Sequence, residues 1–158
     1  MVGDFSVGKT SLISRFVRQT FTDKYMTTVG VKIDSKEVNL LDGQAVKLIL
    51  WDIAGNNRLN STTQSYLRGA AGYLLISDGT RLSTWHNAIA LHHAVRQTIG
   101  EKPCVLLFNK IDLRQQLELT KSLIVEQRRH GLTVLASSAK TGQGVEHAFT
   151  QISQKLLS

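Results

Sequence analysis

A glycine-bounded loop near the start of the chain contains the residue types that hold a phosphate chain. Gly3 and Gly8 flank four free positions, and Lys9 and Thr10 follow directly, as in the P-loop pattern. The glycines let the backbone turn tightly enough for its N–H groups to face phosphate oxygens, and the following helix N-terminus adds a favourable dipole. Lys9 would neutralise the β- and γ-phosphates, and the Thr10 hydroxyl would bind a magnesium ion that bridges them. The predicted phosphate-binding residues are Asp4, Ser6, Val7, Gly8, Lys9, Thr10 and Ser11.

This loop alone does not distinguish ATP from GTP, but two further polar segments favour guanine. Asp112 follows an apolar run, at the carboxyl end of a predicted strand, where ligands bind in open α/β folds. A carboxylate there accepts from both the ring N–H and the exocyclic amine of guanine, whereas a buried carboxylate facing adenine is left unpaired. Ala139 follows another apolar run, and its N–H could donate to the guanine carbonyl. Each segment alone also fits an ordinary polar strand end; together they predict a base site of Asn109, Lys110, Asp112, Ser138, Ala139 and Lys140.

The elements that must position these loops alternate between β-like and helix-like patterns. A helix is predicted over residues 9 to about 18, and an antiparallel pair over 31–41 and 45–51 around the turn signal Asp42-Gly43. Continuous apolar runs over 73–77, 104–109 and 133–137 are typical of parallel strands buried on both faces. Helices are expected over 83–99, about 119–130 and about 145–157, with Gly100 and Gly131 as stops. The prediction is one α/β domain over 1–158, a mostly parallel sheet with one antiparallel edge strand and helices on both faces.

The first strand of such a sheet is short in this sequence. Only Met1 and Val2 precede Gly3, whereas a strand that feeds a phosphate loop usually has about five residues. A missing central strand leaves its neighbours unpaired. We therefore expect a truncated first strand, with the functional form of the chain beginning upstream.

Composition narrows the class of protein but not its partners. With 158 residues, 42% hydrophobic and 20% charged, the chain is typical of a globular domain. It has no apolar run of the roughly 20 residues that a membrane span needs, and we expect a cytoplasmic protein. Cys104, the only cysteine, falls in an apolar run and is expected to be a buried structural thiol. The net charge of +7 comes from scattered residues, so no nucleic-acid partner is expected, and adjacent His92 and His93 are expected to be solvated.

Together these motifs resemble the Ras superfamily of small GTPases, and most closely its Rab branch, over essentially the whole chain. Residues 25–30 resemble the first switch, 51–55 the second, and 66–72 the helix and strand that follow. The resemblance implies a P-loop NTPase G domain that binds GTP or GDP with Mg²⁺. It also implies a small monomeric GTPase whose switch regions bind effectors, exchange factors and activating proteins.

The resemblance also implies roles for single residues of this chain. Phe21 would pack on the guanine ring, with Lys110 on the other side. Thr28 would bind magnesium through its hydroxyl and the γ-phosphate through its backbone, while Asp52 would hold the ion from its outer coordination sphere and the Gly55 N–H would sense the γ-phosphate. The implied metal-binding residues are Thr10, Thr28 and Asp52; the implied catalytic residues are Lys9, Thr28, Gly55 and Asn56. Hydrolysis would release both switch segments and change the partner surface.

Three residues depart from the family pattern where hydrolysis depends on geometry. Asn56 stands where a glutamine usually orients the attacking water, and Asn57 where a glutamate is common. Phe5 occupies a loop position that is commonly small, where a bulky ring would obstruct a partner's arginine finger. We therefore expect slow hydrolysis and poor stimulation by an activating protein. The alternative is a nucleotide-locked binding module with negligible turnover. A third class, an ATP-using kinase or transferase, is disfavoured because the sequence shows no acceptor-binding segment or lid arginine cluster.

The resemblance also bears on partner binding and on membrane attachment. The positions that match the Rab partner patch are Ile33, Trp51 and Tyr66, with isoleucine replacing a usual phenylalanine; they are equally consistent with packing of a sheet edge. The chain ends without the cysteines that carry prenyl groups in Rab proteins, so we expect no direct lipid anchor and only peripheral membrane contact through partners.

Overall fold

The computed structural model describes residues 1–24, 26–56 and 58–158. Tyr25 of the predicted first switch and Asn57 of the second lie outside this set. The strands are β1 (Val2–Gly3), β2 (Val31–Asn39), β3 (Ala45–Ile53), β4 (Tyr73–Asp78), β5 (Cys104–Asn109) and β6 (Thr133–Ala136). The α-helices are α1 (Lys9–Arg18), α2 (Ser61–Leu67), α3 (Leu82–Ile99), α4 (Lys121–Arg129) and α5 (Val145–Leu157), with a 3₁₀ turn over Arg114–Gln116.

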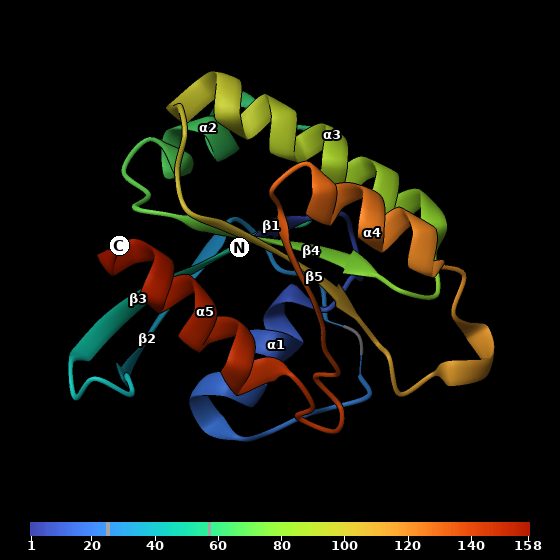
Figure 1. Ribbon diagram of the computed structural model, residues 1–158, viewed down its shortest axis with the longest axis horizontal. Coiled ribbons are helices and arrows are strands. Elements are labelled where there is room, and N and C mark those ends of the chain that lie inside the picture. Colours follow the sequence, from blue (N-terminus) through green and yellow to red (C-terminus); the bar gives the residue numbers. More distant parts are fainter. Residues whose placement is uncertain (25, 57) are drawn as a thin grey trace.

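A parallel sheet forms the middle of the molecule, as the continuous apolar runs predicted. Its strand order is β1-β4-β5-β6. Figure 1 shows helices on both sides of it, with α3 and α4 above the sheet and α1 and α5 below it in that view. The mostly parallel α/β fold is therefore confirmed, and it directs the carboxyl ends of β4, β5 and β6 toward one edge.

Two apolar layers hold the helices against the sheet. Residues of β4 alternate between them, because Leu74 and Ile76 pack toward α1 and α5 whereas Tyr73 and Leu75 pack toward α3. The layer beneath α1 and α5 contains a stacked aromatic pair, Phe16 and Phe149, with ring centroids 3.8 Å apart. Burial on both faces is why these strands read as unbroken apolar sequence.

The antiparallel hairpin is confirmed, and it forms a two-stranded sheet of its own. Its ladder runs from Val31 opposite Ile53 to Asn39 opposite Ala45, and Gly43 provides the turn with φ of 82°. β1 is only two residues long and pairs with β4. The backbone hydrogen bond from the Met1 amine to the Trp51 carbonyl, at 2.7 Å, connects the hairpin to the start of the parallel sheet.

The sequence located most elements closely, and α2 is the main exception. α1, β5 and α5 have the predicted bounds, and α4 starts two residues later than expected. The helix that the family resemblance suggested near residues 66–72 lies earlier, at Ser61–Leu67, where Asn60 Oδ1 accepts the Thr63 N–H at 2.8 Å. With only Thr63 and Leu67 buried, α2 has no apolar period to detect.

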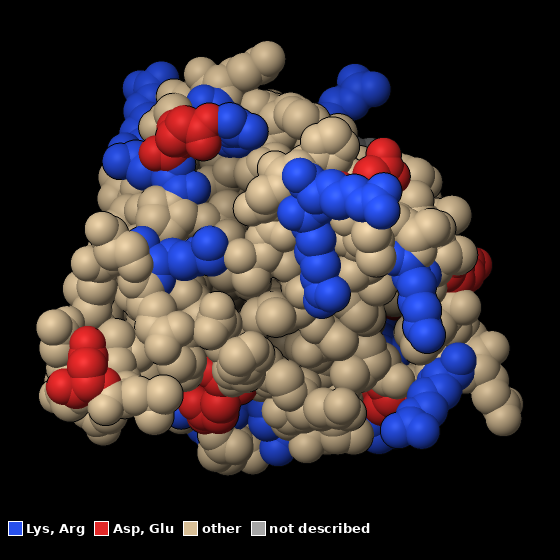
Figure 2. Space-filling model, in the orientation of Figure 1, with Lys and Arg blue, Asp and Glu red and all other residues tan. Residues whose placement is uncertain are grey.

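The surface carries its positive charge in separate groups. Figure 2 shows Lys and Arg side chains spread over the visible face, with acidic residues among them. Within the described residues, no helix combines the length and the apolar character that crossing a bilayer requires. Cys104 is buried and free, as expected, and burial raises the pKa of its thiol to about 12.

The expectation that His92 is solvated is wrong. Its ring is partly buried on α3, and Nδ1 lies 3.0 Å from the Tyr73 hydroxyl. The rings of His92 and Tyr73 contact each other because His92 faces the sheet. His93, the next residue on the helix, is exposed. Burial lowers the pKa of His92 below 6.5, and the charges of Arg96 and His93 lower it further.

This environment predicts an acid sensitivity that one substitution removes. Because the unfolded chain takes up the His92 proton near pH 6.5 and the folded chain does so only at lower pH, the free energy of unfolding should fall as pH drops below about 7. The contribution is at most about 1.4 kcal/mol per pH unit. Urea unfolding between pH 7.5 and 5.5 should show that the free energy of unfolding of His92→Gln falls less steeply with decreasing pH than that of wild type. The exposed His147→Gln is the control, and equal slopes for both variants would contradict the assignment.

Candidate functional site

The loops that follow the strands enclose one large cavity of about 510 Å³. It lies where β1 passes into α1 and where β5 and β6 end, because parallel strands deliver their carboxyl ends to the same edge. Most predicted site residues line it: Ser6, Gly8, Lys9, Thr10, Ser11, Phe21, Thr28, Gly55, Asn109, Lys110, Asp112, Ala139 and Lys140. Segments as far apart in sequence as residues 6 and 140 therefore surround one volume that can hold a nucleotide.

Five predicted residues lie beside the cavity and not on its lining. Val7 is fully buried beneath the loop, and Asp4 turns its carboxylate to Asn87 of α3, whose Nδ2 donates to it at 2.7 Å. Ser138 is buried behind Asp112. Asp52 and Asn56 are described below.

The phosphate loop has the geometry of an anion cradle. Gly8 has φ of 103°, and a Cβ there would lie 2.2 Å from Asn109 Nδ2, so both conformation and space require glycine. Lys9 is buried, and its Nζ donates to the carbonyls of Gly3 at 2.9 Å and Asp4 at 2.7 Å. Burial lowers the Lys9 pKa to about 8, against the opposing effect of Asp52 and Asp4. A phosphate would supply the counter-charge that this ammonium group lacks.

A cluster of oxygens beside Lys9 has the composition of a magnesium site. Thr10 Oγ1 lies 2.7 Å from Thr28 Oγ1 and 2.6 Å from Asp52 Oδ2. Asp52 is 1% exposed, and its Oδ1 is buried without a hydrogen-bond partner. In the described part of the chain, no three His, Cys, Asp or Glu side chains group closely enough to hold a metal by themselves. Two hydroxyls and one carboxylate beside a phosphate cradle fit Mg²⁺, which combines few protein ligands with substrate phosphates.

The base-binding loops are fixed to one another and to the phosphate loop. Asp112 Oδ1 accepts from Ser138 Oγ at 2.7 Å, and Asn109 Oδ1 accepts from the Ala139 N–H at 3.1 Å. Asn109 Nδ2 donates to the Val7 carbonyl at 3.0 Å, so a single side chain joins three loops. The carboxylate of Asp112 is thereby held at the cavity wall in one orientation.

Arg15 is a site residue that the sequence analysis missed. From α1 its Nε donates to the Ala139 carbonyl at 2.7 Å and its Nη2 to the Lys140 carbonyl at 2.6 Å. The guanidinium therefore fixes the second base loop against the helix that starts at the phosphate loop. An arginine on the polar side of an amphipathic helix has no distinguishing signal in the sequence, because its partners are 124 and 125 residues away.

The second-switch segment meets the phosphate loop at Gly55. A Cβ on Gly55 would lie 2.9 Å from Phe5 Cα and 3.0 Å from Lys9 Nζ, so only glycine fits there. Asn56 turns away: its N–H donates to the Gly3 carbonyl at 3.1 Å, and its side-chain oxygen accepts the Arg58 N–H at 3.2 Å. Phe5 lies on the cavity wall with half of its surface exposed.

Comparison with known proteins identifies the family. The model of the Ras family matches residues 1–158, the whole chain. The chain belongs to the Ras family. It is a small GTPase domain of the Ras superfamily and a GTP-binding switch, a class of protein that takes GTP or GDP with Mg²⁺ and acts through regulators and effectors. The cavity, the phosphate cradle and the oxygen cluster are the features of this Ras-family domain that fit those ligands.

The base site predicts a change of nucleotide preference. Asp112→Asn replaces an acceptor for the guanine N–H groups by an amide whose NH₂ can donate to the 2-carbonyl of xanthine. GDP affinity should fall by roughly a hundredfold or more, and XDP affinity should rise. Competition against a fluorescent GDP measures both constants. Asp23→Asn, which changes another carboxylate of the same cavity, should leave the GDP/XDP ratio unaltered; an unaltered ratio in Asp112→Asn would contradict the assignment.

Proposed function

We propose that this domain is a Rab-like switch that binds GTP through the residues named above, hydrolyses it slowly, and regulates intracellular transport or signalling through nucleotide-dependent partner binding. The observation that carries the proposal is the meeting of the phosphate loop, both base loops and both switch segments around one cavity. Nucleotide identity would be read at one end of that cavity, and the presence of a γ-phosphate at the other.

Magnesium would be held by Thr10 and Thr28, with Asp52 behind them. The bound ion supplies positive charge to the β- and γ-phosphates. The three side chains already contact one another through Thr10 Oγ1, and the unpartnered Asp52 Oδ1 gives the cluster an acceptor without a donor. Thr28 belongs to the first-switch segment, so this cluster connects that segment to the phosphate loop.

Switching would follow from the few contacts that hold the two segments. Thr28 meets the phosphate loop through its hydroxyl contact with Thr10. The second-switch segment meets it through the bond from the Asn56 N–H to the Gly3 carbonyl and through the close packing of Gly55 on Phe5 and Lys9. A γ-phosphate that binds the backbone of both segments would add the anchor that stabilises them there. Its hydrolysis would remove that anchor, and both segments would relax.

Slow hydrolysis is supported by Asn56 and Phe5. The side-chain oxygen of Asn56 is occupied by the Arg58 N–H, and the residue does not line the cavity in which the γ-phosphate would lie. An asparagine is also one methylene shorter than glutamine, and positioning of the water is most of what a protein contributes to phosphoryl transfer. The ring of Phe5 stands at the cavity wall, where an arginine finger would have to enter.

The same two residues favour a second candidate, a nucleotide-locked module that holds GTP or GDP and serves mainly for partner docking. Multiple-turnover phosphate release by the pure protein separates the two. Continuous release supports the slow GTPase, and release limited to a single equivalent over hours supports the locked module.

The partner surface would be the exposed apolar face of the hairpin. Ile33 lies directly opposite Trp51 in the ladder, and the Trp51 ring lies 5.9 Å from the ring of Tyr66 on α2. Ile33 and Ile49 are each more than half exposed, so the patch extends along β3. Because Tyr66 follows the second-switch segment, its contact with Trp51 would change with the bound nucleotide.

Trp51 therefore provides a direct test of switching. Intrinsic fluorescence should differ between the GDP form and the form with a non-hydrolysable GTP analogue, because the environment of Trp51 includes Tyr66. Trp51→Phe should abolish the difference, whereas Trp85→Phe, which removes the buried tryptophan of α3, should retain it. A difference that persists in Trp51→Phe would exclude movement at this patch.

The hydrolysis proposal has its own test. Single-turnover hydrolysis of GTP by Asn56→Gln should be about tenfold faster than by wild type, because the longer amide reaches the attacking water. Asn56→Ala removes the amide and should give no gain. A wild-type rate of GTP hydrolysis that is already fast and is unaffected by Asn56→Gln would contradict the slow-GTPase proposal.

A further inference from the structure

The phosphate loop presents successive carbonyl groups from Gly3 to Val7, and a side chain donates to each of them. The pairs, with donor–acceptor distances, are Lys9 Nζ to Gly3 O (2.9 Å) and Asp4 O (2.7 Å), Arg81 Nη2 to Phe5 O (2.7 Å), Lys110 Nζ to Ser6 O (2.8 Å) and Asn109 Nδ2 to Val7 O (3.0 Å). In a trans peptide the carbonyl and the N–H point in opposite directions. Holding these carbonyls therefore fixes the N–H groups of the loop on the opposite side of each peptide.

Ser6 is the residue at which this arrangement is under strain. Its φ is 57°, in the left-handed region that residues other than glycine rarely adopt. Successive N–H groups around a left-handed residue form a concave anion-binding nest. The peptide before Ser6 is held by Arg81 and the peptide after it by Lys110, so two cations fix the strained residue from both sides.

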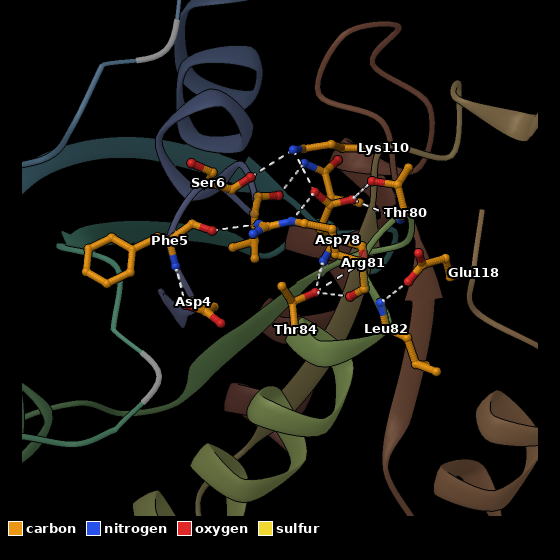
Figure 3. A network of polar contacts seen from close by, with 12 residues as sticks. Asp4, Phe5, Ser6, Asp78, Thr80, Arg81, Leu82, Thr84, Lys110 and Glu118 are labelled. Carbon is orange, nitrogen blue, oxygen red and sulfur yellow. Dashed lines mark hydrogen bonds and ion pairs between the residues drawn. The ribbon is translucent and has the colours of Figure 1, made fainter. Parts of the chain in front are cut away.

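One buried carboxylate holds both cations in position. Asp78, at the end of β4, has a side chain that is 2% exposed, and its Oδ2 lies 3.1 Å from Arg81 Nε and 2.7 Å from Lys110 Nζ. Its Oδ1 accepts from the Thr80 N–H at 2.9 Å and the Thr80 hydroxyl at 2.6 Å. Figure 3 shows Asp78, Arg81 and Lys110 converging on the backbone of Phe5 and Ser6. Burial raises the Asp78 pKa, but the Lys110 and Thr80 donors outweigh it and keep the pKa below its usual value.

Arg81 does not line the nucleotide cavity in the described structure, so it lies behind the loop and not against a ligand. We propose that Arg81 is a positioning residue that holds the Phe5–Ser6 peptide so that the Ser6 N–H faces the terminal phosphates of the nucleotide. The inference rests on the proposed assignment of this loop to phosphate. The fork of the guanidinium is what the role requires, since Nη2 binds the loop while Nε binds Asp78.

The test compares GDP with GMP, which lacks the β-phosphate. Arg81→Met keeps an unbranched apolar stem but removes the guanidinium and both donors, so GDP affinity should fall roughly tenfold or more while GMP affinity is unchanged. Both constants are measured by competition against a fluorescent GDP in the presence of Mg²⁺. The control is Arg96→Met, in the last turn of α3, where the arginine is 44% exposed compared with 41% for Arg81 and pairs with exposed Glu101. The control should retain the wild-type GDP/GMP ratio.

Two outcomes overturn the inference while the nucleotide site stands: an unchanged GDP/GMP ratio in Arg81→Met, or equal losses for the two nucleotides, which would indicate a general structural role. A wild-type protein that binds no guanine nucleotide would overturn the proposed site itself. If circular dichroism shows that Arg81→Met does not fold, Arg81→Lys decides. A lysine ammonium cannot occupy the separate Nε and Nη2 positions of the guanidinium at once, so a ratio between that of the wild type and tenfold below it supports the role, and a wild-type ratio overturns it.

Discussion

The hydrogen bonds of the Asn109 side chain are the interaction on which the nucleotide site depends. Its amide nitrogen holds the Val7 carbonyl of the phosphate loop, and its oxygen accepts from Ala139 of the second base loop. The residue is 2% exposed, so neither bond competes with water, and loss of the side chain would leave buried backbone groups unpaired. One amide at the end of β5 therefore joins the phosphate cradle directly to the second base loop.

The hairpin is attached differently at its two faces. Its inner face packs on α1 and α5, where Lys36 Nζ donates to the Phe16 carbonyl at 2.6 Å and to Glu146 at 2.8 Å. Toward the parallel sheet it is connected through the backbone hydrogen bond from Met1 to Trp51. The core thus holds the hairpin in place, while the segments at its ends, which include Thr28 and Gly55, depend on contacts around the cavity. Such an arrangement suits a domain whose ligand controls those segments.

The predictable part of the fold was the part governed by local pattern. Unbroken apolar runs identified β4, β5 and β6, because strands buried on both faces need no alternation. The apolar pattern did not reveal α2, because this helix buries only two of its seven residues. His92 was misjudged for a related reason: its sequence neighbours gave no sign that the Tyr73 hydroxyl lies within hydrogen-bond distance of the ring.

The sequence by itself determined the class of ligand, because the phosphate-binding pattern and the base-binding segments are short stretches whose residue types specify their chemistry locally. Only the tertiary structure decided which side chains support those stretches. Arg15 of α1 and Arg81, just before α3, are ordinary polar residues in the sequence, yet each donates to backbone carbonyls more than 70 residues away. The reason is physical: a backbone carbonyl accepts from any residue type, so its donor is selected by where the folded chain brings a side chain.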